Sequence, residues 1–334
     1  MAFGGVYAVN GSELDGSVLR AQLKSATRAG EGIIEYGDLR VRELAVPGTS
    51  VRVASGACVV LGREVEFQGS YYGTNFGEEQ VPITATGSGA GRSDMIVAQV
   101  EDPTISGSPW AHDPATEPLI YLRVIQGVDP GATTVPPGIS AIPLARIDLP
   151  ASTGTVEQGH IVDLRRMMAE RSQVVMRVQR GVEPIDYAGN IIKPEFENWP
   201  NIVWTDVYIP EWATQVQIDA VWGQVGFFAS DQAGGSGTTD ALGDARVSLG
   251  VTGNVIRSDW SAYNFNVDPD NGQRVAIFNF DQVAVPASMR GITTSLQMQV
   301  AGAENARGRL RADSASNFKV TLNFLERPVV DVDA

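Results

Sequence analysis

Cysteine is nearly absent from this chain, which has 334 residues and one cysteine. Cys58 therefore has no partner within the chain for a disulfide. It lies in the apolar run 57–61, with no histidine or lysine beside it to lower its pKa, and a thiol in such a run ordinarily packs as a small hydrophobic side chain. We expect Cys58 to be a core residue without redox or catalytic chemistry.

Positive charge is scarce as well. The 25 basic residues are outnumbered by 39 acidic ones, giving a formal net charge of −14, and no basic cluster of five or more occurs. Binding to a phosphate backbone needs lysine and arginine concentrated on one surface. No apolar run approaches the roughly 18 residues that span a bilayer, and no charged segment followed by an apolar stretch opens the chain. We expect no nucleic-acid partner, no membrane insertion, and folding in a cytoplasm.

Signatures of catalysis are missing too. His112 and His160 are the only histidines, and neither stands at a metal-ligand spacing from another histidine or from the cysteine. The sequence contains no nucleophile elbow, phosphate-binding loop or zinc-protease motif. We therefore expect no catalytic residues, no metal and no cofactor, and a protein that is not an enzyme. A pair of carboxylates distant along the chain, as in a glycosidase, is left open by this reasoning.

The 36 glycines and 18 prolines favour a chain of many turns and short strands. In residues 1–165 we expect one short helix near 17–28, because Leu19, Leu23 and Ala26 follow helical spacing. The β-branched stretches 94–100 and 119–125 and the apolar run 142–149 predict strands. This part of the chain is expected to be a β-rich module.

Residues 163–179 predict a short helix, since Leu164, Met168, Val175 and Val178 follow a 4/3 spacing interrupted by Arg171. Two interpretations remain open: a surface helix packed on its own domain, or the neck of an oligomer. The proline- and glycine-rich stretch 180–200 follows it. We expect residues 166–198 to form a helical connector and linker.

Beyond the linker, apolar and polar residues alternate strictly over 215–222, 292–300 and 318–325. Further strands are expected at 203–209, 245–251, 255–260 and 274–280. Seven or more half-buried strands separated by turns predict an antiparallel β-sandwich or jelly roll over 199–334. The fold class expected for the whole chain is mainly β.

The N-terminal half resembles the minor tail proteins of bacteriophages that infect actinobacteria. The resemblance covers about 30–165 and follows an ordered series of short stretches, with nothing recognisable after Arg165. These are Gly30-Glu-Gly32-Ile, Gly37-Asp-Leu-Arg-Val41, Pro47-Gly48 followed by Val51-Arg-Val53, Gly56-Ala57, Tyr71-Tyr72-Gly-Thr-Asn75, Thr86-Gly-Ser, Arg92-Ser-Asp94, Val100-Glu-Asp-Pro103, Pro143-Leu-Ala-Arg-Ile-Asp-Leu-Pro-Ala-Ser-Thr153 and Ile161-Val-Asp-Leu-Arg165.

This resemblance implies a structural component of the virion at the tail tip or baseplate, assembled in the host bacterial cytoplasm. It implies that the N-terminal module, 1–165, docks to other tail-tip or baseplate proteins while the C-terminal sandwich, 199–334, is displayed to the host cell surface. Tail-tip adhesins of this class imply a homotrimer. Two alternatives stay open: a tail-associated depolymerase or glycosidase acting on cell-wall polysaccharide, and a purely structural decoration domain.

Aromatic residues concentrate in one part of the C-terminal half. Four of the six tryptophans fall within 200–265, namely Trp204, Trp212, Trp222 and Trp260. Trp222 shares the inward face of its alternating strand, so we expect it in the core. Trp260 and Tyr263 have the polar neighbours Asp259 and Asn264, which suggests an exposed strand end where rings stack on sugar and polar groups bind hydroxyls. We expect these four residues to bind a bacterial cell-surface glycan, with packing of the two rings as the alternative.

Overall fold

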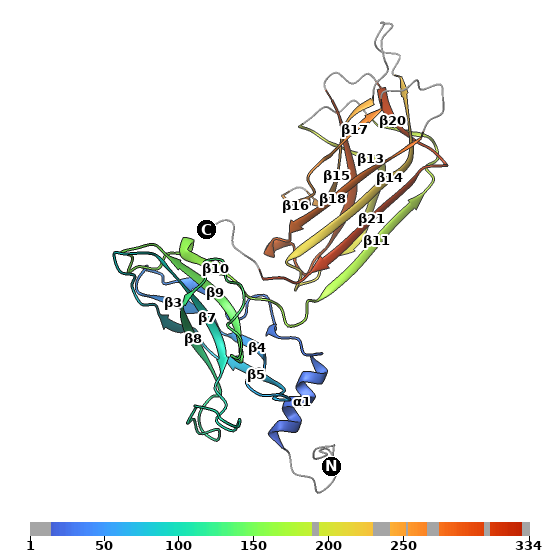
Figure 1. Cartoon of the computed structure of the whole chain (residues 1–334). Coiled ribbons are helices and arrows are strands. Elements are labelled where there is room, and N and C mark those ends of the chain that lie inside the picture. The colour runs from blue at the N-terminus through green and yellow to red at the C-terminus, as the bar shows by residue number, and fades with distance from the viewer. Residues whose placement is uncertain are drawn as a thin grey trace, which may run out of the picture. The chain divides into compact units, whose positions relative to one another are not determined.

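The computed structural model describes residues 15–188, 194–229, 241–251, 253–265, 274–303 and 308–328. Over these residues the chain is mainly β, as expected, and divides into two compact units (Figure 1). The first unit is the chain up to Glu170 together with the residues from Arg327 onward, and the second is Arg171–Glu326.

The helix α1 (Gly16–Ala26) begins the described part of the first unit and confirms the helix expected near 17–28. Asp15 caps it, because its side chain accepts a hydrogen bond from Ser17 N over 2.7 Å. Arg20 Nε donates to the carbonyl of Gln68 over 3.1 Å. This bond attaches the helix to the residues just before β5.

Three antiparallel sheets make up the described strands of the first unit, in the orders β10-β9-β7-β8, β1-β4-β5 and β2-β3-β6. The expected strands at 94–100, 119–125 and 142–149 are confirmed as β7, β8 and β9. The bounds are β1 Gly32–Ile33, β2 Val41–Glu43, β3 Ser50–Val53, β4 Gly56–Leu61, β5 Ser70–Asn75, β6 Glu79–Pro82, β7 Arg92–Val100, β8 Ile120–Val128, β9 Ala141–Leu149 and β10 Ile161–Asp163, with a 3-10 turn at Gln158–His160.

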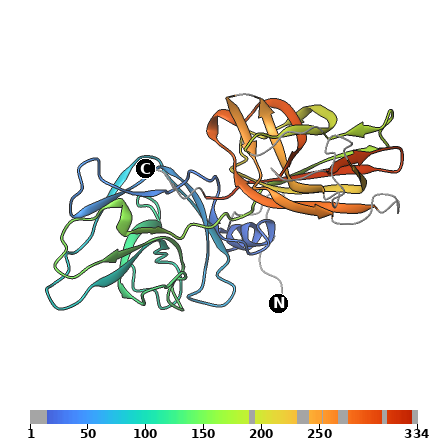
Figure 2. The same ribbon diagram turned by 90° about the horizontal axis from the view of Figure 1, so that it is seen from above.

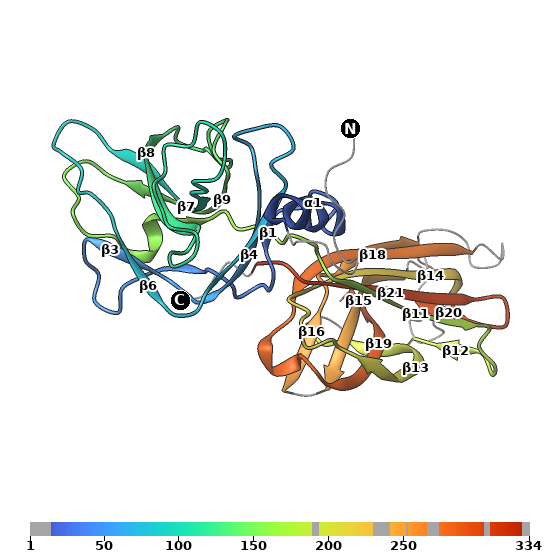
Figure 3. The ribbon, with the colours of Figure 1, turned by 90° about the horizontal axis from the view of Figure 1, so that it is seen from below.

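The second unit is a sandwich of two antiparallel sheets. One has the order β11-β21-β14-β20-β12 with β18 also paired to β14, and the other has the order β13-β19-β15-β16 with β17 also paired to β15. Figures 2 and 3 show the two layers from opposite sides. The bounds are β11 Ser172–Arg180, β12 Asp186–Tyr187, β13 Glu197–Tyr208, β14 Gln215–Ala229, β15 Ala241–Val251, β16 Asn254–Arg257, β17 Ser261–Phe265, β18 Val275–Ala284, β19 Thr293–Gly302, β20 Gly308–Ala312 and β21 Asn317–Leu325, with a 3-10 turn at Ala287–Met289.

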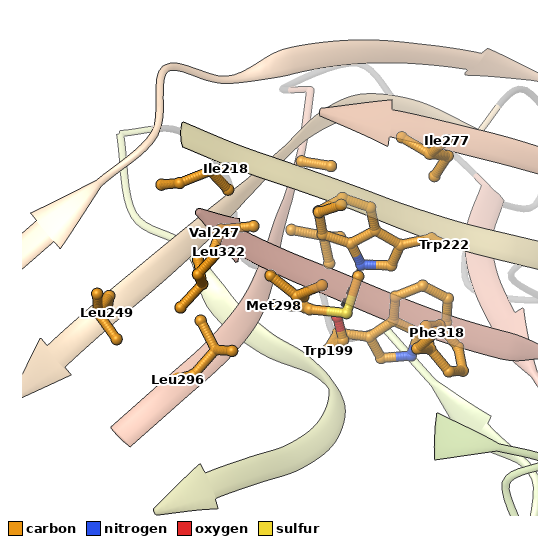
Figure 4. Close-up of a cluster of buried hydrophobic side chains, with 14 of the residues drawn as sticks. Trp199, Ile218, Trp222, Val247, Leu249, Ile277, Leu296, Met298, Phe318 and Leu322 are labelled. Atoms are coloured by element: carbon orange, nitrogen blue, oxygen red, sulfur yellow. Dashed lines mark hydrogen bonds between the residues drawn. The ribbon is translucent and has the colours of Figure 1, made fainter. Parts of the chain in front are cut away.

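The core of the second unit lies between these sheets and confirms the alternation expected over 215–222 and 318–325 (Figure 4). Trp222 is completely buried, as expected, and its indole N–H donates to the carbonyl of Trp199 over 3.2 Å. Trp199 meets Phe318 edge-on, with ring centroids 6.0 Å apart. Aromatic pairs favour this geometry, and both rings are almost fully buried.

The helix expected over 163–179 is wrong, because residues 172–180 form strand β11, paired with β21 along its whole length. Its β-branched valines suit a strand, and tertiary pairing outweighs a weak helical pattern. Leu164 lies in the first unit, while Val175 packs against the core of the second and Val178 is exposed. The expected apolar stripe therefore does not form. The homotrimer stays a prediction, which this segment no longer supports.

The expected connector at 166–198 is also not a separate segment. The backbone of Ile33 bonds to Arg166 O and to Met168 N, both over 2.9 Å, so the first unit continues past residue 165. Strands β11 and β12 and the start of β13 belong to the second unit. The two units meet in sequence at Glu170 and Arg171.

A buried carboxylate stabilises the turn between β20 and β21. Asp313 is 6% exposed and accepts hydrogen bonds from Arg274 over 2.6 Å and from Arg311 over 3.0 Å. Ala315 N donates to its other oxygen over 3.0 Å. The bond from Arg274 is the largest cause that lowers the pKa of Asp313 to about 2.

We predict that Asp313→Asn destabilises the protein at pH 7 by about 2 kcal/mol, the worth of the lowered pKa. A carboxyl with a depressed folded-state pKa stabilises the fold above its unfolded value of about 4 and loses this contribution as pH falls towards about 2. The difference in unfolding free energy between wild type and variant, measured by urea titration, should shrink over that window. A difference that stays constant from pH 5 to about pH 2 would contradict this assignment.

Candidate functional site

The expected glycan-binding residues lie around the connection between β16 and β17. Asp259 and Trp260 are both exposed there, and Trp260 keeps 58% of its surface accessible. Asn264 is exposed within β17, opposite Leu242 of β15. Three of the four expected residues are therefore accessible to a ligand.

Tyr263 is not accessible, and its expected ligand role is wrong. It is 9% exposed, its hydroxyl donates to the carbonyl of Ala301 over 3.3 Å, and its ring stacks with Phe265. Burial is the main cause that raises the pKa of Tyr263. The pairing explains its position: Tyr263 lies directly opposite Gly243, where even a Cβ would come within 2.4 Å of the tyrosine hydroxyl. The missing side chain makes room for the ring.

A buried amide holds the Trp260 segment against β18. The Asn279 side chain is directed inward, and its amide N–H donates to the carbonyl of Asp259 over 2.7 Å and to Ser261 Oγ over 3.0 Å. In return, Asp259 N donates to Asp281 Oδ2 over 2.7 Å. The residues on both sides of Trp260 are thus bonded to side chains of β18, Asp259 through its backbone and Ser261 through its hydroxyl.

The opposite face of β18 carries two exposed aromatic rings that the sequence reasoning did not identify. Phe278 and Phe280 are 50% and 65% exposed, and their rings lie 6.0 Å apart with planes inclined by 12°. They follow from the inward direction of Asn279, since neighbouring side chains of a strand point to opposite faces. The only sequence signal for this arrangement is the pattern Phe278-Asn279-Phe280. By itself, that pattern favours the opposite orientation, with the two rings in the core.

Amide side chains continue this face across the neighbouring strands. Asn323 donates to Gln217 over 3.1 Å, and Gln217 donates to Gln282 over 3.1 Å. Gln282 in turn donates to Gln215 over 2.7 Å. Asp219 lies directly opposite Phe280 in the same face. We call Phe278, Phe280, Gln217 and Gln282 the β18 surface.

The first unit contains a buried polar cluster around Glu101, which is fully buried. Arg123 donates to both of its carboxylate oxygens, over 2.6 Å and 2.9 Å, and His112 Nε2 lies 2.6 Å from Glu101 Oε2. The Tyr121 hydroxyl lies 3.2 Å from the other imidazole nitrogen. His112 thereby connects the proline-rich loop to the sheet. Within the described ranges, no group of three or more metal-binding side chains is present.

A groove of about 730 Å³ runs beside β5 and residues 118–122 of the first unit. Tyr72 and Phe76 line it and are exposed. Cys58 also lines it and is buried, as expected, and burial raises the pKa of this thiol to about 12. In the described part of the chain, no helix is long and apolar enough to cross a membrane.

Comparisons with known proteins give no family. No family model matches the sequence, and no curated protein matches it at a significant level. Among solved structures, one of the Gx strain of infectious bursal disease virus is 12% identical and has a TM-score of 0.28, with 90% of this chain and 73% of that chain covered.

Two further structures give similar values. A VP2 subviral particle of the same virus is 11% identical over 91% of this chain and 74% of that chain, with a TM-score of 0.27. A structure of carbohydrate-binding modules of the β-sandwich superfamily is 9% identical over 87% of this chain and 93% of that chain, with a TM-score of 0.16. At TM-scores this low, these likenesses assign neither a function nor a partner.

We predict that Phe280→Ala changes the unfolding free energy by no more than about 0.5 kcal/mol, because an exposed side chain contributes little to stability. The matched variant Phe318→Ala removes a fully buried ring of the same sheet and should cost about 3–5 kcal/mol. Chemical denaturation of both variants measures the difference. Equal losses would show that Phe280 is packed in the core and that β18 faces the other way.

Proposed function

We propose that this chain is a structural protein of a virion, a minor tail protein at the tip of a phage tail. The first unit docks to other tail-tip or baseplate proteins, and the second presents its β18 surface to a glycan of the bacterial cell surface. The observation that carries the proposal is the β18 surface itself, where exposed aromatic rings and amides lie together on a rigid sandwich.

The chemistry of a saccharide suits this surface. Sugar rings present flat C–H faces that pack on aromatic rings, and Phe278 and Phe280 expose two stacked rings on one strand. Gln217 and Gln282 each keep donor and acceptor capacity beyond the hydrogen bonds that join them. Their bonds also hold these amides in place, which reduces the side-chain entropy lost on binding.

The stretches that resemble phage tail proteins support an attachment role for the first unit, because they build its framework. The last of them ends at Arg165, which is 5% exposed. Its guanidinium donates to both oxygens of Asp163 and to the carbonyls of Tyr36 and Asp38. Arg92 likewise donates to both oxygens of Asp94, over 2.8 Å each. These ion pairs stabilise the fold of the module and are not themselves the binding site. We infer that a partner binds the outer surface of the folded module.

We predict that Phe278→Ala and Phe280→Ala each weaken binding of the full chain to host cells at least tenfold, equivalent to about 1.4 kcal/mol. Trp260→Ala, at the separate exposed ring between β16 and β17, is measured beside them. Tyr208→Ala is the matched control, because Tyr208 is a 43% exposed aromatic residue of the other sheet in the same unit. Binding of fluorescently labelled protein is measured beside the melting temperature. Normal binding by both β18 variants, or equal weakening by Tyr208→Ala, would exclude the β18 surface.

The same protein, incubated with host cell-wall polysaccharide, distinguishes a binder from a depolymerase. The proposal predicts retention of the polysaccharide without new reducing ends. Release of reducing ends that Asp259→Asn or Asp281→Asn abolishes would instead identify a glycosidase, since hydrolysis of a glycosidic bond needs a pair of carboxyl groups.

We predict that a fragment of residues 1–170 suffices for incorporation into tails. The boundary is placed after Glu170 because Arg166 and Met168 bond to Ile33 within the first unit. A phage lacking the gene is complemented with the fragment, and purified particles are analysed by mass spectrometry. Incorporation of the full chain alone, with the fragment soluble and folded, would place the attachment surface in the second unit.

A further inference from the structure

Strand β11 is the outermost strand of its sheet and is paired with β21 alone among the described strands. It is nine residues long. Its solvent side carries Val174, Met176 and Val178, which are 63%, 56% and 45% exposed. Native proteins usually protect an edge by making it short or by placing proline, charged side chains or a bulge in it, because unpaired backbone groups recruit further strands. β11 is long and contains no proline, lysine or bulge; its charged residues are Arg177, which pairs with Asp206, and Arg180.

Two hydrogen bonds at the ends of β11 fix the direction of its backbone groups. Glu326 N donates to Arg171 O over 3.0 Å, and Gly181 N donates to Ser316 O over 2.8 Å. In an antiparallel pair, residues bonded to the partner strand alternate with residues whose N–H and C=O point away from it. The odd-numbered positions of 171–181 therefore bond to β21. The three exposed apolar residues, all at even positions, direct their backbone groups to the open edge.

The sequence of β11 is nearly symmetric about its centre. Around Met176, Val174 is mirrored by Val178 and Gln173 by Gln179. Two copies of this strand placed antiparallel and centred on Met176 set valine opposite valine and glutamine opposite glutamine. Directly opposed residues in a sheet lie on the same face, so the apolar side chains of both copies would pack together there.

Charges do not oppose this arrangement. In the same register Arg177 lies opposite Val175 of the second copy, and Arg180 lies opposite Ser172. Like charges directly opposite one another destabilise a strand pair, and none occur here. Arg177 donates to the carbonyl of Met176 over 3.2 Å. That oxygen has a second lone pair for a bond from the neighbouring chain.

The other end strands of the sheet are less suited to pairing. β12 has two residues. The Trp260 segment lies against β18, where the Asn279 amide and the Asp281 carboxylate hold it. Among the described strands of this sheet, β11 thus presents the long unprotected edge.

We propose that two copies of this chain associate edge to edge through β11, antiparallel and about a two-fold axis at Met176. The two six-stranded sheets then become continuous, and the open backbone groups of both edges bond to each other. This is an isologous interface, in which the same strand supplies both sides. This interface gives a dimer with two-fold symmetry, whereas the resemblance to tail-tip adhesins implied a homotrimer. The proposal does not depend on glycan binding.

Single-cysteine cross-linking of the full chain tests the register. Cys58 is buried and its pKa is raised to about 12, so this thiol does not react. A cysteine introduced in β11 is therefore the reactive thiol of each variant. Facing residues at a hydrogen-bonded antiparallel position have Cα atoms about 5.5 Å apart, a distance that a disulfide spans. We expect Met176→Cys to form a disulfide-linked dimer on mild oxidation by itself. Val174→Cys should cross-link only when mixed with Val178→Cys.

Light scattering of the unmodified protein at micromolar concentration provides the second readout, with twice the chain mass as the expected result. Met176→Lys places two like charges at the axis and should return the protein to single chains. Val251→Lys, at a valine that is 63% exposed on the other sheet, should leave the dimer intact. A single-chain or three-chain mass for the wild type overturns the proposal. So does cross-linking of Val174→Cys alone as efficient as that of Met176→Cys.

Discussion

The second unit depends on the register of β14. This strand pairs with β21 and β18 over its first part and with β20 over its last four residues. The same alternation that turns Trp222 into the core aligns rows of side chains on the outer face. One such row runs from Met176 through Thr321 and Asp219 to Phe280. The β18 surface and the open β11 edge are opposite ends of these rows, so a single packing constraint positions both.

Much of this architecture follows from the sequence, because its cause is local. Strict alternation identifies strands wherever one face is buried and the other solvated, as in the part of β14 that begins at Gln215 and in β21. The helix α1 follows equally from its apolar spacing and Asp15.

The remaining features depend on partners distant in sequence. Residues 172–180 have a helical pattern, and only pairing with β21 makes them a strand. Asn279 faces inward, where the carbonyls of Ala245 and Asp259 and the hydroxyl of Ser261 accept hydrogen bonds from its amide. The neighbouring Phe278 and Phe280 are exposed as a consequence. Tyr263 is buried because Gly243 lies opposite it. Trp260, in contrast, is exposed as its polar neighbours suggested.

Hydrogen–deuterium exchange of the full chain with and without purified host cell-wall glycan tests the central claim most directly. A ligand that stacks on the β18 surface slows opening of the strands that hold it, and exchange of their amides slows in proportion. The account predicts protection of peptides covering 215–222 and 275–284, with unchanged exchange in β13 and throughout the first unit. Protection confined to the first unit, or none at a glycan concentration that saturates binding, would contradict it.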